Sequence, residues 1–251
     1  MAAFLENRRP LLTAMIAAHT PEEAIAKILD SHADGAESFY IQLELLCREY
    51  WEPQTLRRIF SYCRSKPVIV TAYRFGHAAG CSDDERAQLL LLGLECGAAV
   101  CDVMGDLFHP EADQLTFDEA AVQKQTALIR EIHERGGEVL MSTHLSRFFQ
   151  KEELIAYAKA QQSRGADLCK LVNRADTQAQ LLENLQTAAA LQEQLSIPYL
   201  LLANGAYSRL LRLAGVNLGV CMYLCLQRFT ALDFPEQPLL REAAQARAVL
   251  L

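Results

Sequence analysis

The segment EVLMSTHLSRFFQKEELIAYAKAQQSRGADLCKLVN, residues 138–173, decides the fold class. It begins with an apolar run at Glu138–His144, continues through a longer amphipathic stretch, and ends with a second apolar run at Leu168–Asn173. Short apolar runs are typical of buried strands, and apolar residues at three- and four-residue spacing are typical of a helix. The segment therefore predicts one strand–helix–strand unit of an α/β protein.

The same alternation continues along the whole chain, with no linker in it. The apolar runs that predict strands are Leu11–Ile16, Ser38–Glu44, Pro67–Tyr73, Ala98–Val103, Glu138–His144, Leu168–Asn173, Tyr199–Gly205 and Asn217–Leu224. Amphipathic stretches between them, such as Ala120–His133 and Gln178–Gln194, predict helices. Repeated β-then-α units favour a (β/α)8 TIM barrel that forms a single domain over residues 1–251. A doubly wound sheet normally has a glycine-rich loop after its first strand, but Ile16–Pro21 contains no glycine.

Composition and charge narrow the classes of partner. Hydrophobic residues make up 51% of the 251 and charged residues 22%, as in a soluble protein with a large core. The net charge of −7 argues against nucleic acid or an anionic membrane as a partner. The first ten residues have no apolar stretch long enough for a signal sequence, and the uncharged stretch 213–227 is too short to span a bilayer. We therefore expect a cytoplasmic protein.

The cysteines and histidines give no indication of a metal or an organic cofactor. Eight cysteines are present, several of them within apolar runs, and none forms a CxxC pair. Zinc or thioredoxin-type chemistry therefore has no support from the spacing. No pattern of histidine and carboxylate resembles a metal site either. We expect reduced thiols and no cofactor.

Lys170 is the first candidate for chemistry because it interrupts a predicted buried strand. A buried ammonium costs several kcal/mol unless it is paired or loses its proton. Desolvation lowers the pKa of an amine, and a neutral amine is the nucleophile that imine formation requires. The alternatives are a lysine that faces solvent from an edge strand and a structural ion pair.

His144 is the second candidate, because it ends the strand that precedes the one with Lys170. Imidazole titrates near neutrality and can move protons to and from a substrate. A histidine at a strand end is more often a polar rim residue, but a buried lysine on the next strand strengthens the catalytic interpretation. His19 and His77 also lie near strand ends, within reach of a pocket.

With these residues in view, the sequence resembles the type I 3-dehydroquinate dehydratases. Val139–His144 resembles the family's strand that ends in the catalytic histidine, and Gly165–Lys170 resembles the "GAD-x-x-K" motif that ends in the imine-forming lysine. Arg212–Gly215 resembles the "R-L-A-G" segment, whose arginine holds the substrate carboxylate. Pro235–Gln237 resembles the end of the closing loop, where a glutamine meets the substrate.

The resemblance implies a Schiff-base lyase of the shikimate route. Lys170 would form an imine with a ketone, and His144 would take a proton from the adjacent carbon and return it to the departing hydroxyl. It also implies a keto acid substrate, a TIM barrel and a homodimer.

Several residues in the first half of the chain depart from the family pattern. Where the second strand of the family has Glu-x-Arg-x-Asp, this chain has Tyr40, Gln42 and Glu44. In the third strand, Tyr73 replaces an arginine, and His77 stands where a glutamate that orients the catalytic histidine is expected. The expected site therefore keeps the imine apparatus but has a different hydroxyl-binding side, which should change the choice of substrate.

Three further positions bear on these departures. Arg74 is one residue beyond the missing arginine, and a one-residue slip directs a side chain to the other face of a strand. Met104 replaces an acidic residue of the fourth strand. Asp233 stands where the closing loop has a serine, and its carboxylate would either weaken the binding of an anion or pair with Arg212.

Three functional hypotheses follow. The first is dehydration of a β-hydroxy ketone or keto acid, either 3-dehydroquinate itself or a less hydroxylated relative handled by a paralogous dehydratase, aromatase or aldolase-type enzyme. The second is a non-catalytic barrel that binds a keto acid. The third is an unrelated barrel with a structural lysine, which the motifs of the second half argue against.

Overall fold

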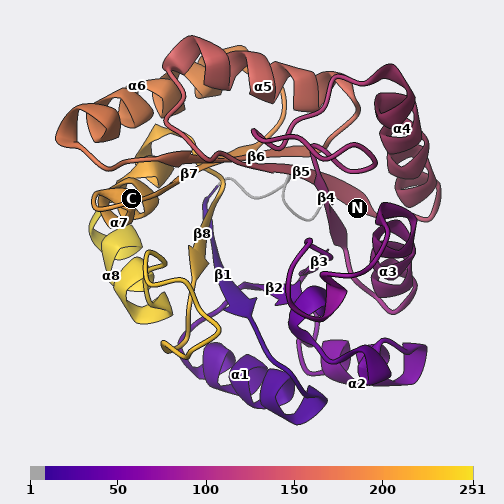
Figure 1. The fold of residues 1–251 in the computed structure, drawn as a ribbon. Coiled ribbons are helices and arrows are strands. Elements are labelled where there is room, and N and C mark those ends of the chain that lie inside the picture. The colour runs from indigo at the N-terminus through magenta and orange to yellow at the C-terminus, as the bar shows by residue number, and fades with distance from the viewer. Residues whose placement is uncertain (1–8, 251) are drawn as a thin grey trace.

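The computed structural model describes residues 9–250, in which parallel strands form a ring with helices on its outside (Figure 1). The strands are β1 (Leu11–Ile16), β2 (Ser38–Gln42), β3 (Val68–Thr71), β4 (Val100–Met104), β5 (Glu138–His144), β6 (Leu168–Arg174), β7 (Tyr199–Asn204) and β8 (Met222–Cys225). Their order is β7-β6-β5-β4-β3-β2-β1-β8, and a bridge between Tyr199 and Val220 joins the two ends. The predicted (β/α)8 barrel is confirmed.

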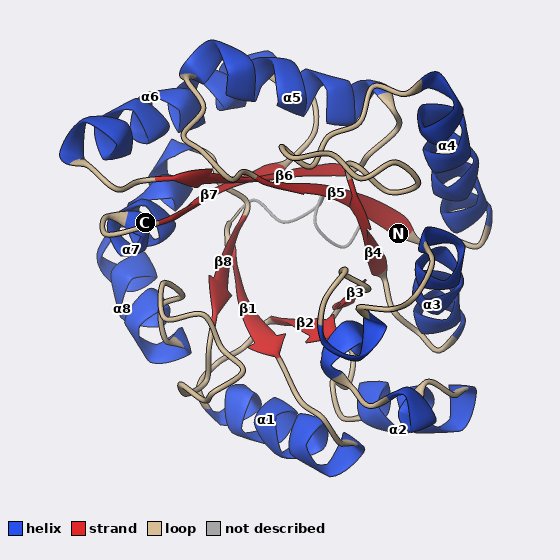
Figure 2. Cartoon of the chain, in the orientation of Figure 1, coloured by secondary structure: helices blue, strands red, loops and turns tan. Residues whose placement is uncertain are grey.

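The helices follow the strands in alternation and pack against the outer face of the ring (Figure 2). They are α1 (Pro21–Ala33), α2 (Pro53–Ser61), α3 (Asp83–Glu95), α4 (Glu119–Glu134), α5 (Lys151–Ser163), α6 (Gln178–Gln194), α7 (Ser208–Ala214) and α8 (Leu240–Leu250). Short 3-10 helices lie at η1 (Leu43–Leu45), η2 (Arg48–Tyr50), η3 (Gly76–Ala78) and η4 (Gly215–Leu218). No helix among residues 9–250 is both long and apolar enough to cross a membrane.

Several predicted strands were too long, most clearly those that correspond to β2, β3 and β8. β2 ends at Gln42, where the chain turns into η1, and β3 ends at Thr71, before the predicted end at Tyr73. β8 begins at Met222, because the first residues of the predicted strand lie in η4. An apolar run does not distinguish a strand from the buried 3-10 turn that adjoins it.

The ring places chemically active side chains of neighbouring strands at one height. In the parallel register Ser142 of β5 is paired with Lys170 of β6, and β5 pairs on its other side with β4. Side chains alternate between the two faces of a strand, so every second residue points into the barrel. The βα loops and strand ends on the carboxyl side then form the rim on which such barrels carry their sites.

Candidate active site

A cavity of about 350 Å³ opens among the carboxyl ends of the strands. Its polar lining comes from several strands and loops: Gln42, Tyr73, Arg74, Gln114, His144, Lys170, Asn204, Arg212 and Gln237. Its apolar lining consists of Met15, Phe75, Met104, Val172, Leu202, Leu224 and Phe234. The two residues proposed for catalysis therefore face one space together with the predicted carboxylate-binding arginine.

Lys170 lies inside the ring, with only 3% of its surface exposed. Its Nζ donates to the hydroxyls of Tyr40 and Tyr73, each at 2.8 Å, and lies 3.3 Å from Oδ2 of Asp102. An ammonium has three hydrogens, so these partners occupy its full donor capacity. The lysine thus faces inward, as predicted, and it also forms a buried ion pair.

Asp102, on β4, is the partner that sequence reasoning missed. It accepts hydrogen bonds from Tyr40, from Ser142 and from Tyr73, the last at 2.6 Å. The residue lies two positions before Met104, on the same face of the strand, so the period of two places both inside the barrel. An acidic residue at an inward position of a buried strand was the available signal.

The pKa of Lys170 is lowered from its ordinary value, mainly by burial, while the charge of Asp102 opposes that effect. The pKa values of Tyr40 and Tyr73 are raised well above the usual range, first by burial and then by the Asp102 charge. Both phenols therefore stay neutral near pH 7. Lys170 and Asp102 can therefore share one proton while both phenol rings stay neutral.

His144 is fixed by Gln114, a residue of the long loop between β4 and α4. The backbone N–H of His144 donates to Oε1 of Gln114 at 3.0 Å, which identifies that atom as the oxygen. Nδ1 of His144 lies 3.1 Å from the same oxygen, so Nδ1 carries the proton and Nε2 keeps a free lone pair. Burial and the charges of Lys170 and Arg212 hold the pKa of His144 well below its ordinary value. The imidazole is therefore neutral and available as a base.

The lysine and the histidine are linked through Tyr73. The rings of Tyr73 and His144 meet edge to face, with centroids 5.2 Å apart, while the Tyr73 hydroxyl accepts a hydrogen bond from Nζ of Lys170.

The loop that carries Gln114 packs closely over Gly105, where an added Cβ would lie 2.8 Å from the backbone carbonyl oxygen of Gln114 and from Oγ1 of Thr143. Oγ1 of Thr143 also donates to that carbonyl oxygen, at 3.0 Å.

Arg212 approaches the cavity from α7 in a different electrostatic setting. Its Nε donates to the carbonyl of Ala203 at 3.2 Å, and its Nη2 to Oδ1 of Asn204 at 3.3 Å. Its Nη1 is buried without a hydrogen-bond partner among residues 9–250. Burial lowers the pKa of Arg212 to about 10, so the guanidinium remains charged at neutral pH. A buried cation with a free donor is suited to a carboxylate.

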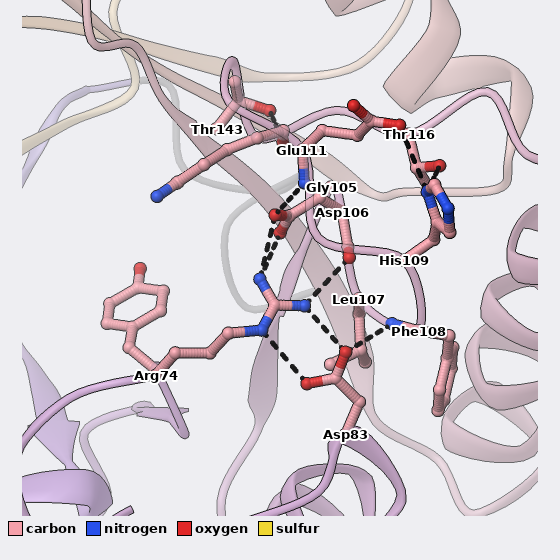
Figure 3. Close-up of polar contacts among 12 residues, drawn as sticks. Arg74, Asp83, Gly105, Asp106, Leu107, Phe108, His109, Glu111, Thr116 and Thr143 are labelled. Carbon is pink, nitrogen blue, oxygen red and sulfur yellow. Dashed lines mark hydrogen bonds and ion pairs between the residues drawn. The ribbon is translucent and has the colours of Figure 1, made fainter. Parts of the chain in front are cut away.

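Arg74 does not replace the arginine missing from the third strand. Figure 3 shows its guanidinium held between Asp83 and Asp106, with bonds of 2.7–3.1 Å to the two carboxylates. It also donates to the carbonyl of Asp106 at 2.9 Å. The side chain borders the cavity, but its donors serve to join the β3α3 and β4α4 loops.

Other predicted site residues lie apart from the cavity or contact different partners. Glu44 is fully buried beside Gln42 and Thr71, and burial raises its pKa to about 7. His77 contacts Cys47 and does not border the cavity. For Asp233, two alternatives were open, and the structure does not show the pairing with Arg212: the Asp233 carboxylate lies 3.7 Å from Nζ of Lys27 and accepts from Thr230.

The sequence matches the profile of the type I 3-dehydroquinases over residues 12–250. The chain belongs to this family. Among the curated proteins, none matches the sequence.

Solved structures of the family show the same fold. The 3-dehydroquinate dehydratase of Geobacillus kaustophilus superposes with a TM-score of 0.83 at 16% identity, over 98% of this chain and 93% of that one. The type I enzyme of Clostridium difficile, solved with covalently modified comenic acid, gives 0.83 at 17% identity, over 98% and 94%. The Enterococcus faecalis enzyme gives 0.78 at 16%, over 98% and 95%. The chain is a divergent member of the family.

Proposed function

We propose that the protein is a carbon–oxygen lyase of the shikimate route that dehydrates a β-hydroxy ketone bearing a carboxylate, through an imine on Lys170. Membership of the type I 3-dehydroquinases supports the reaction class. One observation carries the assignment to these residues: an amine buried to 97%, a neutral imidazole and an arginine with a free donor border one cavity.

In the first step the substrate carboxylate binds Nη1 of Arg212, and Gln237, which is buried and borders the cavity, offers a second donor. Asp102, 3.3 Å from Nζ, accepts the proton that the Lys170 ammonium must lose before attack. The free amine adds to the ketone carbon, and the resulting carbinolamine loses its hydroxyl as water, with the proton that Asp102 had taken, to give a protonated imine and the Asp102 carboxylate.

In the second step Nε2 of His144 takes a proton from the carbon next to the imine, and the electron pair moves to form an enamine. The enamine expels the β-hydroxyl, which leaves as water with the proton that His144 had taken. Hydrolysis of the conjugated imine then frees the enone and Lys170. The histidine ends in the neutral form in which it began.

We expect a substrate with fewer hydroxyls on the side that faces the cavity wall formed by β2 and β3. Tyr40 and Tyr73 direct their hydroxyls to Lys170 and Asp102, so they are engaged within the protein. Gln42 is the polar residue of β2 that borders the cavity. This arrangement favours a keto acid with few hydroxyls on that side. A homodimer and a cytoplasmic location remain predictions.

The imine can be trapped by reduction. The protein is incubated with 3-dehydroquinate, or separately with a keto acid that keeps the β-hydroxyl but lacks the other ring hydroxyls, in the presence of borohydride, and digested for mass spectrometry. We expect a reduced adduct on the peptide that contains Lys170, and, in parallel incubations without borohydride, water elimination from at least one of the two.

The His144→Ala variant separates the two steps. It should still form the adduct, because imine formation uses the amine, while elimination falls by about 10²- to 10⁴-fold, as for loss of a general acid–base. Elimination at the wild-type rate in this variant, or the absence of any adduct on Lys170 in the wild type, would contradict the proposed roles.

A further inference from the structure

Three potential metal ligands converge outside the cavity, on the carboxyl side of the barrel. His19 follows β1, Cys47 follows η1, and His77 lies in η3 after β3. They belong to the βα loops of three adjacent strands, which are far apart in sequence. Their ligating nitrogen and sulfur atoms all lie within 4.8 Å of one another.

The distances are close to those of a metal site. Sγ of Cys47 and Nε2 of His77 are 3.3 Å apart, and the rings of His19 and His77 meet edge to face with centroids at 5.4 Å. Tetrahedral zinc, with Zn–S of about 2.3 Å and Zn–N of about 2.0 Å, separates such ligand atoms by roughly 3.3–3.6 Å. One pair therefore already has the required spacing, and the third ligand needs only a small side-chain movement.

The surrounding backbone presents His19 in the form that binds a metal. Its Nδ1 lies 3.0 Å from the carbonyl oxygen of Leu45, so Nδ1 carries the proton and Nε2 is left with a lone pair. A metal-binding histidine usually donates its other nitrogen in this way, often to a backbone carbonyl. The N–H of Cys47 donates to the carbonyl of His19 at 3.0 Å, which fixes the first two loops to each other.

The third loop is fixed by Arg48, the neighbour of Cys47, whose Nε donates to the carbonyl of His77 at 2.6 Å. Glu23 accepts from the backbone N–H of His19 at 2.9 Å. The charges of Arg48 and Glu23 cancel. Any negative charge that offsets a divalent cation here must therefore come from the Cys47 thiolate.

We propose that His19, Cys47 and His77 bind one Zn²⁺ ion and so join the first three βα loops. Two imidazoles and a thiolate are the borderline-soft set that zinc prefers, and three protein ligands leave a fourth position for water. The spacing rules failed to indicate this site because its ligands are dispersed over three loops. Gln42, Tyr73 and Phe75, which border the cavity, lie in the same segments as Cys47 and His77.

The test uses the full chain, stripped with a chelator and titrated with zinc alone. We expect one ion per chain. Binding should weaken by at least about a hundred-fold in Cys47→Ala and in His77→Ala, since loss of an outer partner of a ligand already costs about 10- to 100-fold. Cobalt in place of zinc should give a thiolate charge-transfer band that Cys47→Ser removes.

Two matched variants control for the loss of a thiol or an imidazole elsewhere. Cys81→Ser and His133→Ala, the latter at a histidine that bonds Asp167, should bind zinc like the wild type. If a ligand variant does not fold in chelator, as judged by circular dichroism, His19→Ala at the exposed ligand replaces it. The absence of zinc binding in the wild type, or equal binding by all variants, overturns the proposal. No substrate is involved, so the result is independent of the proposed reaction.

Discussion

Two cationic side chains border the same cavity in opposite situations. Lys170 has an acceptor for each of its three hydrogens, one of them a carboxylate, whereas Arg212 has no carboxylate within bonding distance among the described residues and keeps one buried nitrogen without a partner. A buried charge is costly unless it is paired. In the proposed reaction Lys170 must therefore give up its proton before it can attack the ketone. The free Nη1 of Arg212, in contrast, gains a partner when an anion binds.

The difference suggests two roles for the two sides of the barrel, proton transfer on one and substrate binding on the other. In the proposed reaction the side of β4 and β6 transfers the proton of Lys170 to Asp102, because these two groups and the hydroxyls beside them are already in contact. In the proposed reaction the side of β7 and α7 binds the substrate, because a free buried donor interacts strongly with a carboxylate. The three predictions that follow test each side of this comparison.

Loss of the amine should have the largest effect. Lys170→Met keeps the apolar length of the side chain but removes the nucleophile, so we expect no trapped adduct and a fall in kcat/KM of more than about 10⁴-fold. It also leaves Asp102 buried without its cation, which typically costs about 3–5 kcal/mol. The double variant Lys170→Met/Asp102→Asn should recover thermal stability without recovering activity. Turnover in either variant would show that the amine is not the nucleophile.

Loss of the free guanidinium should have an intermediate effect. Arg212→Gln removes a charged hydrogen bond worth about 1.5–3 kcal/mol, so the KM of a keto acid should rise by about 10- to 100-fold. A ketone without a carboxylate should be unaffected.

Arg74→Gln is the matched control, because its guanidinium is already engaged by Asp83 and Asp106. This variant should lower the melting temperature but leave the KM of the keto acid close to that of the wild type. The comparison fails if the two variants raise KM equally.

The smallest effect is expected on the pH dependence. The Asp102 charge raises the pKa of Lys170, against the effect of burial. In Asp102→Asn that pKa falls, so the neutral amine is present at lower pH and the acid limb of adduct formation moves toward lower pH. The measurement is the rate of adduct formation against pH in both proteins. A shift toward higher pH would mean that Asp102 does not act on the amine through its charge.

The architecture could be predicted from the sequence because it depends on periodicity. All of the predicted strands correspond to strands of the barrel, and the errors lie at their ends, as in the segment that became η4. A barrel is specified redundantly by many apolar positions, so an error of a few residues at one end does not change the result.

The site was predictable only where a residue was unusual for its position. Lys170 was conspicuous in a buried strand, and its burial was confirmed. Asp102 is likewise a charged residue within a predicted buried strand, but of the fourth strand only Met104 was singled out. Gln114 gave no signal, because it lies in an irregular loop whose path depends on tertiary contacts. The convergence of His19 with His77 also depends on how three loops pack.

The close approach at Gly105 connects the loop geometry to the acid–base chemistry. A methyl group at this position would collide with the backbone carbonyl of Gln114, and the shift of that residue would also move its side-chain Oε1, which holds Nδ1 of His144. Without that acceptor the imidazole is free to rotate or to exchange its tautomer, so Nε2 no longer keeps its lone pair for the proton transfer proposed above. Even alanine at residue 105 would therefore be poorly tolerated, although that residue has no functional group of its own.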